Sequence, residues 1–157
     1  MYKFIAIILL WGLFFAACEK VTSHPKESHA PKLLKVEVPD SIKIPDGATY
    51  NKALVKAWVE DEDGLNDIKY VFFYSEKPDG SPGNEGYPLL MVDNGLPFFI
   101  NNPWEEAGDE VAGDGIYSLT VVIMNNNLPG RYYFTFYAQD KSDSLSNAII
   151  DSIEVYQ

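Results

Sequence analysis

The sequence predicts an all-β domain, an antiparallel β-sandwich of seven to eight strands. From residue 33 to the end, apolar and polar residues alternate in short segments, which is typical of strands with one buried face. Turn-forming groups such as Pro45-Asp46-Gly47 lie between these segments. No stretch shows the apolar spacing of a helix, and several short strands at regular intervals indicate a sandwich.

Nine segments carry the strand pattern. We expect them, in chain order, at residues 34–38, 41–44, 53–60, 68–74, 87–92, 97–100, 116–124, 131–139 and 149–156. The second is expected to continue the edge of the first after the break at Pro39-Asp40. The third places Val55, Ala57 and Val59 on one face, and the fourth is apolar on both faces, which is typical of a central strand.

The later segments complete the two sheets. The fifth and sixth flank Asp93-Asn94-Gly95, a group that favours a hairpin turn. The side chains expected in the core are Trp58, the face formed by Tyr132, Phe134, Phe136 and Ala138, and the pair Ile153 and Val155. An aromatic content of 14% indicates a core rather than a binding stripe.

The first seventeen residues have the composition of a secretion signal. Lys3 supplies the cation, an apolar run extends from Phe4 to Phe15, and the small residues Ala16 and Ala17 follow. A membrane-spanning helix needs about 20 residues, which is more than this run provides. We therefore expect residues 1–17 to be a cleaved signal peptide.

The only cysteine of the chain follows this segment directly. Phe15-Ala16-Ala17-Cys18 resembles the bacterial lipobox, in which an aliphatic residue more often precedes the two small ones. The resemblance implies cleavage before Cys18, diacylglycerol on its sulfur and acylation of its new amino group. Several acyl chains would anchor the protein in a membrane of the bacterial cell envelope, at the outer membrane or cell surface in a Gram-negative organism. The alternatives are a plain secretory signal with an incidental free cysteine, or a buried cysteine near a cytosolic N-terminus.

Two further segments are expected after the signal. Residues 18–32 are polar and contain both histidines, His24 and His29, so we expect a flexible linker that carries the lipid at its start. Residues 33–157 suit a single domain. The formal net charge is −11, and it becomes −12 once Lys3 is removed with the signal. An acidic chain without a basic stripe excludes nucleic acid as a partner.

Three stretches resemble immunoglobulin-like and fibronectin-type-III-like domains of exported bacterial proteins. Asp61–Ile68 is similar to the B–C corner of such domains, and Gly108–Ser118 carries their pattern GD-x-x-AGDG-x-Y. Gly130–Asp140, with Ser146-Asn147, is similar to their last two strands. The resemblance covers about residues 33–157 and implies an immunoglobulin-like sandwich, here without a disulfide. Such modules serve as spacers, adhesion units or binding domains, so the resemblance implies no activity.

Two acidic loops are candidate calcium sites. Asp61, Asp63 and Asp67 surround a glycine in the first loop, and Asp109 and Asp114 lie in the second. Calcium takes six to eight oxygen ligands, which closely spaced carboxylates and carbonyls supply. The alternative is that these carboxylates accept hydrogen bonds from backbone N–H groups in turns. No metal site is firmly predicted, and no cofactor other than this calcium is expected.

The residues of the domain do not favour an enzyme. Residues 33–157 contain no histidine to act as a base, no serine in a nucleophile elbow and no glycine-rich phosphate loop after a strand. Trp104, in a polar loop with a proline, and Tyr87 are candidate ligand contacts, although a loop tryptophan also often caps the end of a sandwich. Two functions follow: contact with an envelope protein as an accessory or structural module, or binding of a cell-surface glycan around Trp104.

Overall fold

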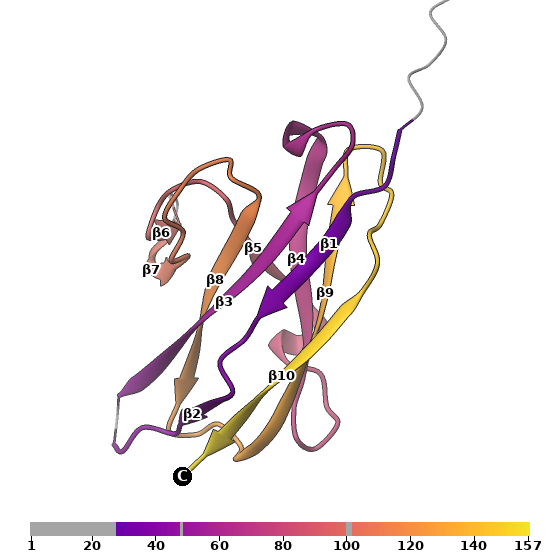
Figure 1. Cartoon of the computed structure of the whole chain (residues 1–157). Helices are drawn as coiled ribbons and strands as arrows, with labels where there is room; N and C mark the ends of the chain where they lie inside the picture. The colour runs from indigo at the N-terminus through magenta and orange to yellow at the C-terminus, as the bar shows by residue number, and fades with distance from the viewer. Residues whose placement is uncertain (1–27, 48, 100–101) are drawn as a thin grey trace, which may run out of the picture.

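The computed structural model describes residues 28–47, 49–99 and 102–157, with only the backbone at 99 and 102–105. Within these ranges the protein is all-β, and eight strands form two sheets that pack face to face (Figure 1). One sheet has the order β1-β3-β8, where β1 is Lys32–Glu37, β3 is Tyr50–Glu60 and β8 is Ile116–Met124. The other has the order β2-β10-β9-β4-β5, where β2 is Ser41–Lys43, β10 is Ile149–Tyr156, β9 is Gly130–Asp140, β4 is Ile68–Glu76 and β5 is Leu89–Met91. A separate hairpin pairs β6 (Phe98–Phe99) with β7 (Asn102–Glu106), and the short 3₁₀ turns η1 (Leu65–Asp67) and η2 (Asn84–Gly86) lie in connections.

The chain changes sheets between its first two strands. β1 pairs antiparallel with β3, whereas β2 pairs parallel with β10 in the opposite sheet. Pro39 lies at the crossing, where a residue without an N–H group interrupts the ladder. The sequence-based expectation that residues 41–44 continue the edge of the first strand is therefore wrong. The eight-stranded, two-sheet arrangement is immunoglobulin-like and confirms the predicted fold class.

The predicted hairpin between residues 87–92 and 97–100 does not form. β5 pairs with β4, and β6 pairs with β7. The turn at Asp93-Asn94-Gly95 is held by distant residues instead: Gly95 N–H donates to Asp109 Oδ2 at 2.5 Å, and Gly115 N–H donates to Asp93 Oδ2 at 2.9 Å. These long-range hydrogen bonds turn the chain away from the strand that precedes it.

The core lies between the inner faces of the two sheets. Phe73 from β4 lies 4.9 Å from both Phe134 and Phe136 of β9, measured between ring centroids, and Phe73 and Phe136 are fully buried. Val55 and Ala57 of β3 close the core from the other sheet. The predicted burial of the Tyr132–Ala138 face and of Ile153 and Val155 is confirmed.

Trp58 was expected in the core, and this expectation is wrong. Its neighbours Ala57 and Val59 point inward and are buried, so the alternation of β3 directs Trp58 to the outer face of the sheet. There the ammonium group of Lys35 lies 3.7 Å from the centroid of the Trp58 ring, a cation–π contact on the sheet surface.

Candidate functional site

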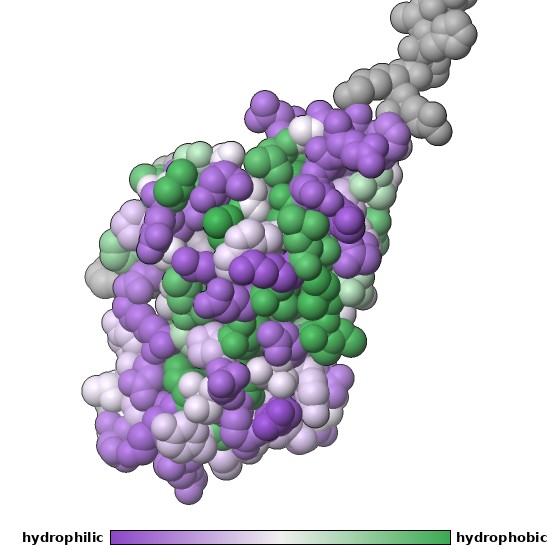
Figure 2. All heavy atoms as spheres, viewed as in Figure 1, coloured by the Kyte–Doolittle hydropathy of each residue, from purple (hydrophilic) through white to green (hydrophobic). Residues whose placement is uncertain are grey.

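The described chain enters the sandwich beside the β3–β4 and β9–β10 connections. Ser28 Oγ donates to Asp140 Oδ2 at 3.3 Å, and His29 N–H donates to Asp63 Oδ2 at 2.7 Å. Pro31 is buried. The last residues of the predicted linker therefore contact the domain, at an end where Figure 2 shows hydrophilic side chains gathered. None of the described segments is a helix long and apolar enough to span a membrane.

Asp61, Asp63 and Asp67 converge at this end of the sandwich. One carboxylate oxygen from each lies within 4.8 Å of the others. Gly64 makes the turn between them with φ +99°, which disfavours any residue with a side chain. Asp61 Oδ1 accepts the N–H of Asp63 at 2.7 Å, while Asp61 Oδ2 is buried without a hydrogen-bond partner. The His29 ring lies 3.4 Å from Asp63 Oδ2 and so competes with any cation there.

The orphaned carboxylate oxygen is the feature of this cluster that fits a bound cation, because a buried oxygen without a partner is costly. Calcium remains a prediction, and Asp61, Asp63 and Asp67 would supply three of its six to eight oxygens. Calcium at about 100 times its dissociation constant should stabilise the protein by about 2.7 kcal/mol, hence a Tm rise of roughly 10 °C. The measurement is calorimetry in calcium against chelator, with Asp61→Asn expected to abolish the shift. An unchanged Tm in the wild-type protein would contradict the site.

Asp109 and Asp114 are not part of this cluster. Asp109 is buried and accepts the Gly95 N–H described above, and Asp114 Oδ1 accepts the N–H of Ile116 at 2.9 Å. Both carboxylates thus perform the turn-stabilising role that the sequence left open as the alternative to calcium. The glycines of this loop serve the same turn, because a Cβ on Gly115 would lie 2.9 Å from the carbonyl oxygen of Val59.

Asp140 is the fully buried carboxylate at this end of the sandwich. Burial alone would raise the pKa of Asp140, but hydrogen bonds from Ser142 and Ser144 outweigh burial and lower the pKa below its ordinary value of 3.8. A carboxylate with a lowered folded-state pKa stabilises the protein above pH 3.8, and this contribution disappears as the pH falls through the folded pKa.

Acid should therefore destabilise the wild-type protein more than a variant without this carboxylate. We expect Asp140→Asn to lower the Tm at pH 7 by roughly 5 °C or more, because its amide cannot accept the same set of hydrogen bonds. The difference between the two proteins should shrink as the pH falls below 3.8. Thermal melts across this range test the prediction, and a pH-independent difference would contradict it.

The outer face of the five-stranded sheet carries exposed aromatic and aliphatic side chains. We define the aromatic face as Tyr70, Phe72, Tyr74, Leu90, Tyr133, Thr135, Tyr137, Leu145 and Ile150. The register places Phe72 opposite both Leu90 and Tyr137, and Thr135 opposite both Tyr74 and Ile150. Tyr70, Tyr74 and Tyr133 are 46%, 43% and 47% exposed. Tyrosines this exposed on adjoining strands form a continuous apolar surface.

The aromatic face is hollowed near its centre. Phe72, Tyr74, Thr135, Tyr137 and Leu145 line a shallow cavity of about 440 Å³. The rings of Phe72 and Tyr74 meet edge to face, with centroids 5.8 Å apart and planes at 90°, and those of Phe72 and Tyr137 are tilted by 30° at the same distance. The surface therefore offers a hollow between ring edges rather than a set of coplanar rings.

The sequence-based interpretation missed this face because it assigned the aromatic residues to the core. A signal was present: β4 is aromatic at Tyr70, Phe72 and Tyr74 as well as at the inward Phe73, and β9 places Tyr133 and Tyr137 opposite to its buried face. Aromatic residues at five outward positions of two adjoining strands exceed what a solvated face requires.

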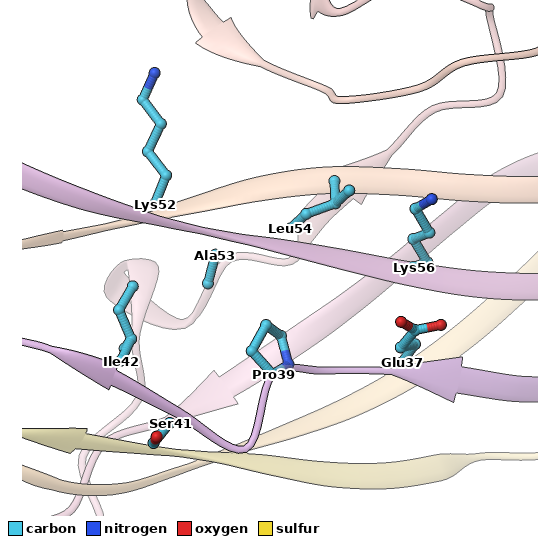
Figure 3. Close-up of a pocket in the computed structure, with 8 residues that line it drawn as sticks. All are labelled: Glu37, Pro39, Ser41, Ile42, Lys52, Ala53, Leu54 and Lys56. Carbon is cyan, nitrogen blue, oxygen red and sulfur yellow. The ribbon is translucent and has the colours of Figure 1, made fainter.

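A second hollow lies where β1 leaves β3. The pocket has a volume of about 340 Å³ and is lined by Glu37, Pro39, Ser41, Ile42, Lys52, Ala53, Leu54 and Lys56. Figure 3 shows Lys52, Leu54 and Lys56 on one side of β3 and Ala53 on the other. A hydrogen bond from Lys52 to Glu106 raises the pKa of Lys52, which favours the protonated amine. Glu37 is the one carboxylate among the lining residues, so they offer no pair of carboxylates.

The remaining candidates can be placed only in part. Tyr87 follows η2 and is 68% exposed. Trp104 belongs to β7, but its side chain is outside the described residues, and so is Cys18. Their predicted roles stay predictions.

Comparisons with known proteins find similarity in fold. No protein-family model matches the sequence, and no curated protein does. Among solved structures, the PKD domain of a peptidase from a Thermoplasmatales archaeon is 13% identical with a TM-score of 0.45, covering 83% of this chain and 100% of that domain. A Niemann-Pick type C2 protein from the Japanese carpenter ant is 10% identical with a TM-score of 0.39, covering 83% and 96%. A family 123 glycoside hydrolase from Clostridium perfringens is 12% identical with a TM-score of 0.33, covering 72% of this chain but 22% of that enzyme. None of these similarities bears on activity.

Proposed function

We propose that the chain is a lipid-anchored protein of the bacterial cell envelope whose immunoglobulin-like domain acts by contact with a protein, without catalysis. The lipobox-like Phe15-Ala16-Ala17-Cys18 supports the anchor. The contact surface is the aromatic face, and its exposed, continuous apolar side chains are the observation on which this proposal depends.

The position where the described chain begins supports contact through a face of a sheet rather than through an end of the sandwich. The described chain begins at the end of the sandwich that holds η1, and the C-terminus lies at the opposite end (Figure 1). Residues 18–27 would reach at most about 36 Å from a membrane-bound Cys18 to that end. A domain tethered by one end presents both sheet faces to neighbouring molecules.

The chemistry of the aromatic face favours a protein partner. Buried tyrosines contribute strongly to protein interfaces, because each ring covers a large area at little cost in side-chain entropy. Stacked sugar rings need aromatic faces turned to solvent, whereas the edge-to-face contact of Phe72 and Tyr74 turns one ring toward its neighbour. The hollow beside them suits an apolar side chain that projects from a partner.

The glycan alternative rests on Tyr87, which is the most exposed tyrosine of the described residues, together with Trp104. A polysaccharide-retardation gel with the purified full chain distinguishes the two functions. Retardation that is lost in Trp104→Ala but kept in Tyr74→Ala would support glycan binding. Unretarded migration would leave protein contact as the function.

Removing one tyrosine from the aromatic face should reduce partner capture. We expect Tyr74→Ala, in cells that express the full chain, to lower the yield of cross-linked partner about tenfold or more, because truncating a central aromatic residue often has this effect. The yield is measured by affinity capture and mass spectrometry after cross-linking. Tyr50→Ala is the matched control, since Tyr50 is a 58% exposed tyrosine of the other sheet. Equal yields from both variants would contradict the proposed surface.

A further inference from the structure

We infer that the partner at the aromatic face is a second copy of this chain. The inference rests on the proposed function and names the occupant of the proposed contact surface. Three properties of the face support it: the apolar area it exposes, the arrangement of charges around it, and a shape that contains both a hollow and projecting side chains.

The exposed apolar area matches the requirement of a dimer. The six large apolar side chains on the face are exposed at 46% (Tyr70), 43% (Tyr74), 47% (Leu90), 47% (Tyr133), 51% (Leu145) and 65% (Ile150). At roughly 200 Å² per large side chain, these fractions amount to about 600 Å². A stable interface buries about 800 Å² per partner, of which the core is about 65% apolar. The face therefore supplies the apolar centre of an interface of ordinary size.

The charges around the face fit an identical partner. The chain carries a formal net charge of −11, so two copies repel each other wherever acidic surfaces meet. At the rim of this face, Lys69 is paired with Asp143 at 2.6 Å and Arg131 with Glu154 at 3.2 Å. Among the described outward residues of β4 and β9, Glu76 alone carries a charge without an ion pair. The face offers little charge to select an oppositely charged partner, and two copies can meet there without burying an acidic cluster.

The shape of the face is complementary to itself. Thr135 is a small residue on β9 between Tyr74 and Ile150, and it forms part of the floor of the cavity. Ile150 projects from the same face. A two-fold axis near Thr135 lets the projecting side chains of each copy enter the hollow of the other. Two such sheets would pack about 10 Å apart, as sheets do within a sandwich.

The proposed anchor strengthens this contact. Chains held in one membrane by Cys18 meet at a raised effective concentration, so a face of modest affinity suffices for pairing. A soluble partner gains no such advantage.

A single engineered thiol tests the inference in intact cells that express the full chain. Cys18 is the only native cysteine, and its sulfur is used by the proposed lipid, so a new cysteine is the one free thiol. We expect Thr135→Cys to form a disulfide-linked dimer under mild oxidation at about ten times the yield of Val122→Cys, which places its thiol on the outer face of the other sheet. Tyr133→Cys repeats the test two residues along β9 if the first variant folds poorly.

A thiol-reactive benzophenone attached to the same cysteines tests the second copy separately from the proposed contact surface. An adduct of two copies, together with the disulfide dimer, supports the second copy. An adduct with a different protein, without a dimer, overturns the second copy and leaves the contact face in place. Yields from Thr135→Cys and Tyr133→Cys that equal that of Val122→Cys, without any adduct, overturn both.

Discussion

Replacing Phe136 with alanine is expected to lower the free energy of unfolding by about 3–5 kcal/mol, the usual cost of truncating a buried aromatic residue. Phe136 is fully buried, with its ring centroid 4.9 Å from that of Phe73 and 6.3 Å from that of Phe134. Its removal leaves a cavity between the two sheets. Because domains are stable by only about 5–15 kcal/mol, this loss removes a large share of the total stability. Urea denaturation measures the change in the midpoint.

The matched control is Tyr137→Ala, the next residue of β9 but on the aromatic face. Tyr137 is only partly buried, so we expect a loss of about 1 kcal/mol or less. Equal losses from the two variants would mean that the alternation of β9 does not divide buried from outward side chains.

Replacing Cys18 with serine is expected to move the protein from the membrane fraction to the soluble fraction. Each buried methylene contributes about 0.8 kcal/mol, so losing several acyl chains removes nearly all of the membrane affinity. Carbonate extraction of membranes, followed by immunoblotting, measures the change. Thr22→Ser, in the same segment, retains the cysteine and should stay with the membrane. Recovery of Cys18→Ser from the pellet in the wild-type amount would contradict the lipid anchor.

The strands were predictable because apolar and polar residues alternate in the sequence in the same way as buried and exposed side chains alternate along a strand. The last strand was expected at residues 149–156 and forms at Ile149–Tyr156, since Ile153 and Val155 can reach the core only in that register. The wrong expectation for Trp58 arose because this alternation was not followed. A large apolar side chain was given more weight than its position between two inward-facing neighbours, and the strand alternation decided its direction.

The missing hairpin shows that the residues of a turn do not determine by themselves which strands pair. Asp93-Asn94-Gly95 has the residues of a tight turn, but the direction of the chain there depends on Asp109 and on the loop that ends at Gly115. These partners are 14 and 22 residues away from the residues that they bind. A local pattern cannot identify them.

The acidic cluster and the aromatic face differed in how far the sequence alone could predict them. The convergence of Asp61, Asp63 and Asp67 follows from one short loop and was predictable. The aromatic face joins residues from four strands, and whether a sheet face is covered by another layer depends on the whole topology. The alternation along β4 and β9 signals the outward tyrosines, but whether another layer covers them depends on how the two sheets pack.

Radical footprinting of tyrosines in intact cells tests the central claim most directly, because the chain contains its own controls. Tyr70, Tyr74 and Tyr133 of the aromatic face are 43–47% exposed, whereas Tyr50 and Tyr87 lie elsewhere and are 58% and 68% exposed. If the face is a contact surface, its three tyrosines should be labelled about tenfold less than the two controls, although exposure alone predicts similar labelling. Labelling of all five in proportion to their exposure would contradict the account.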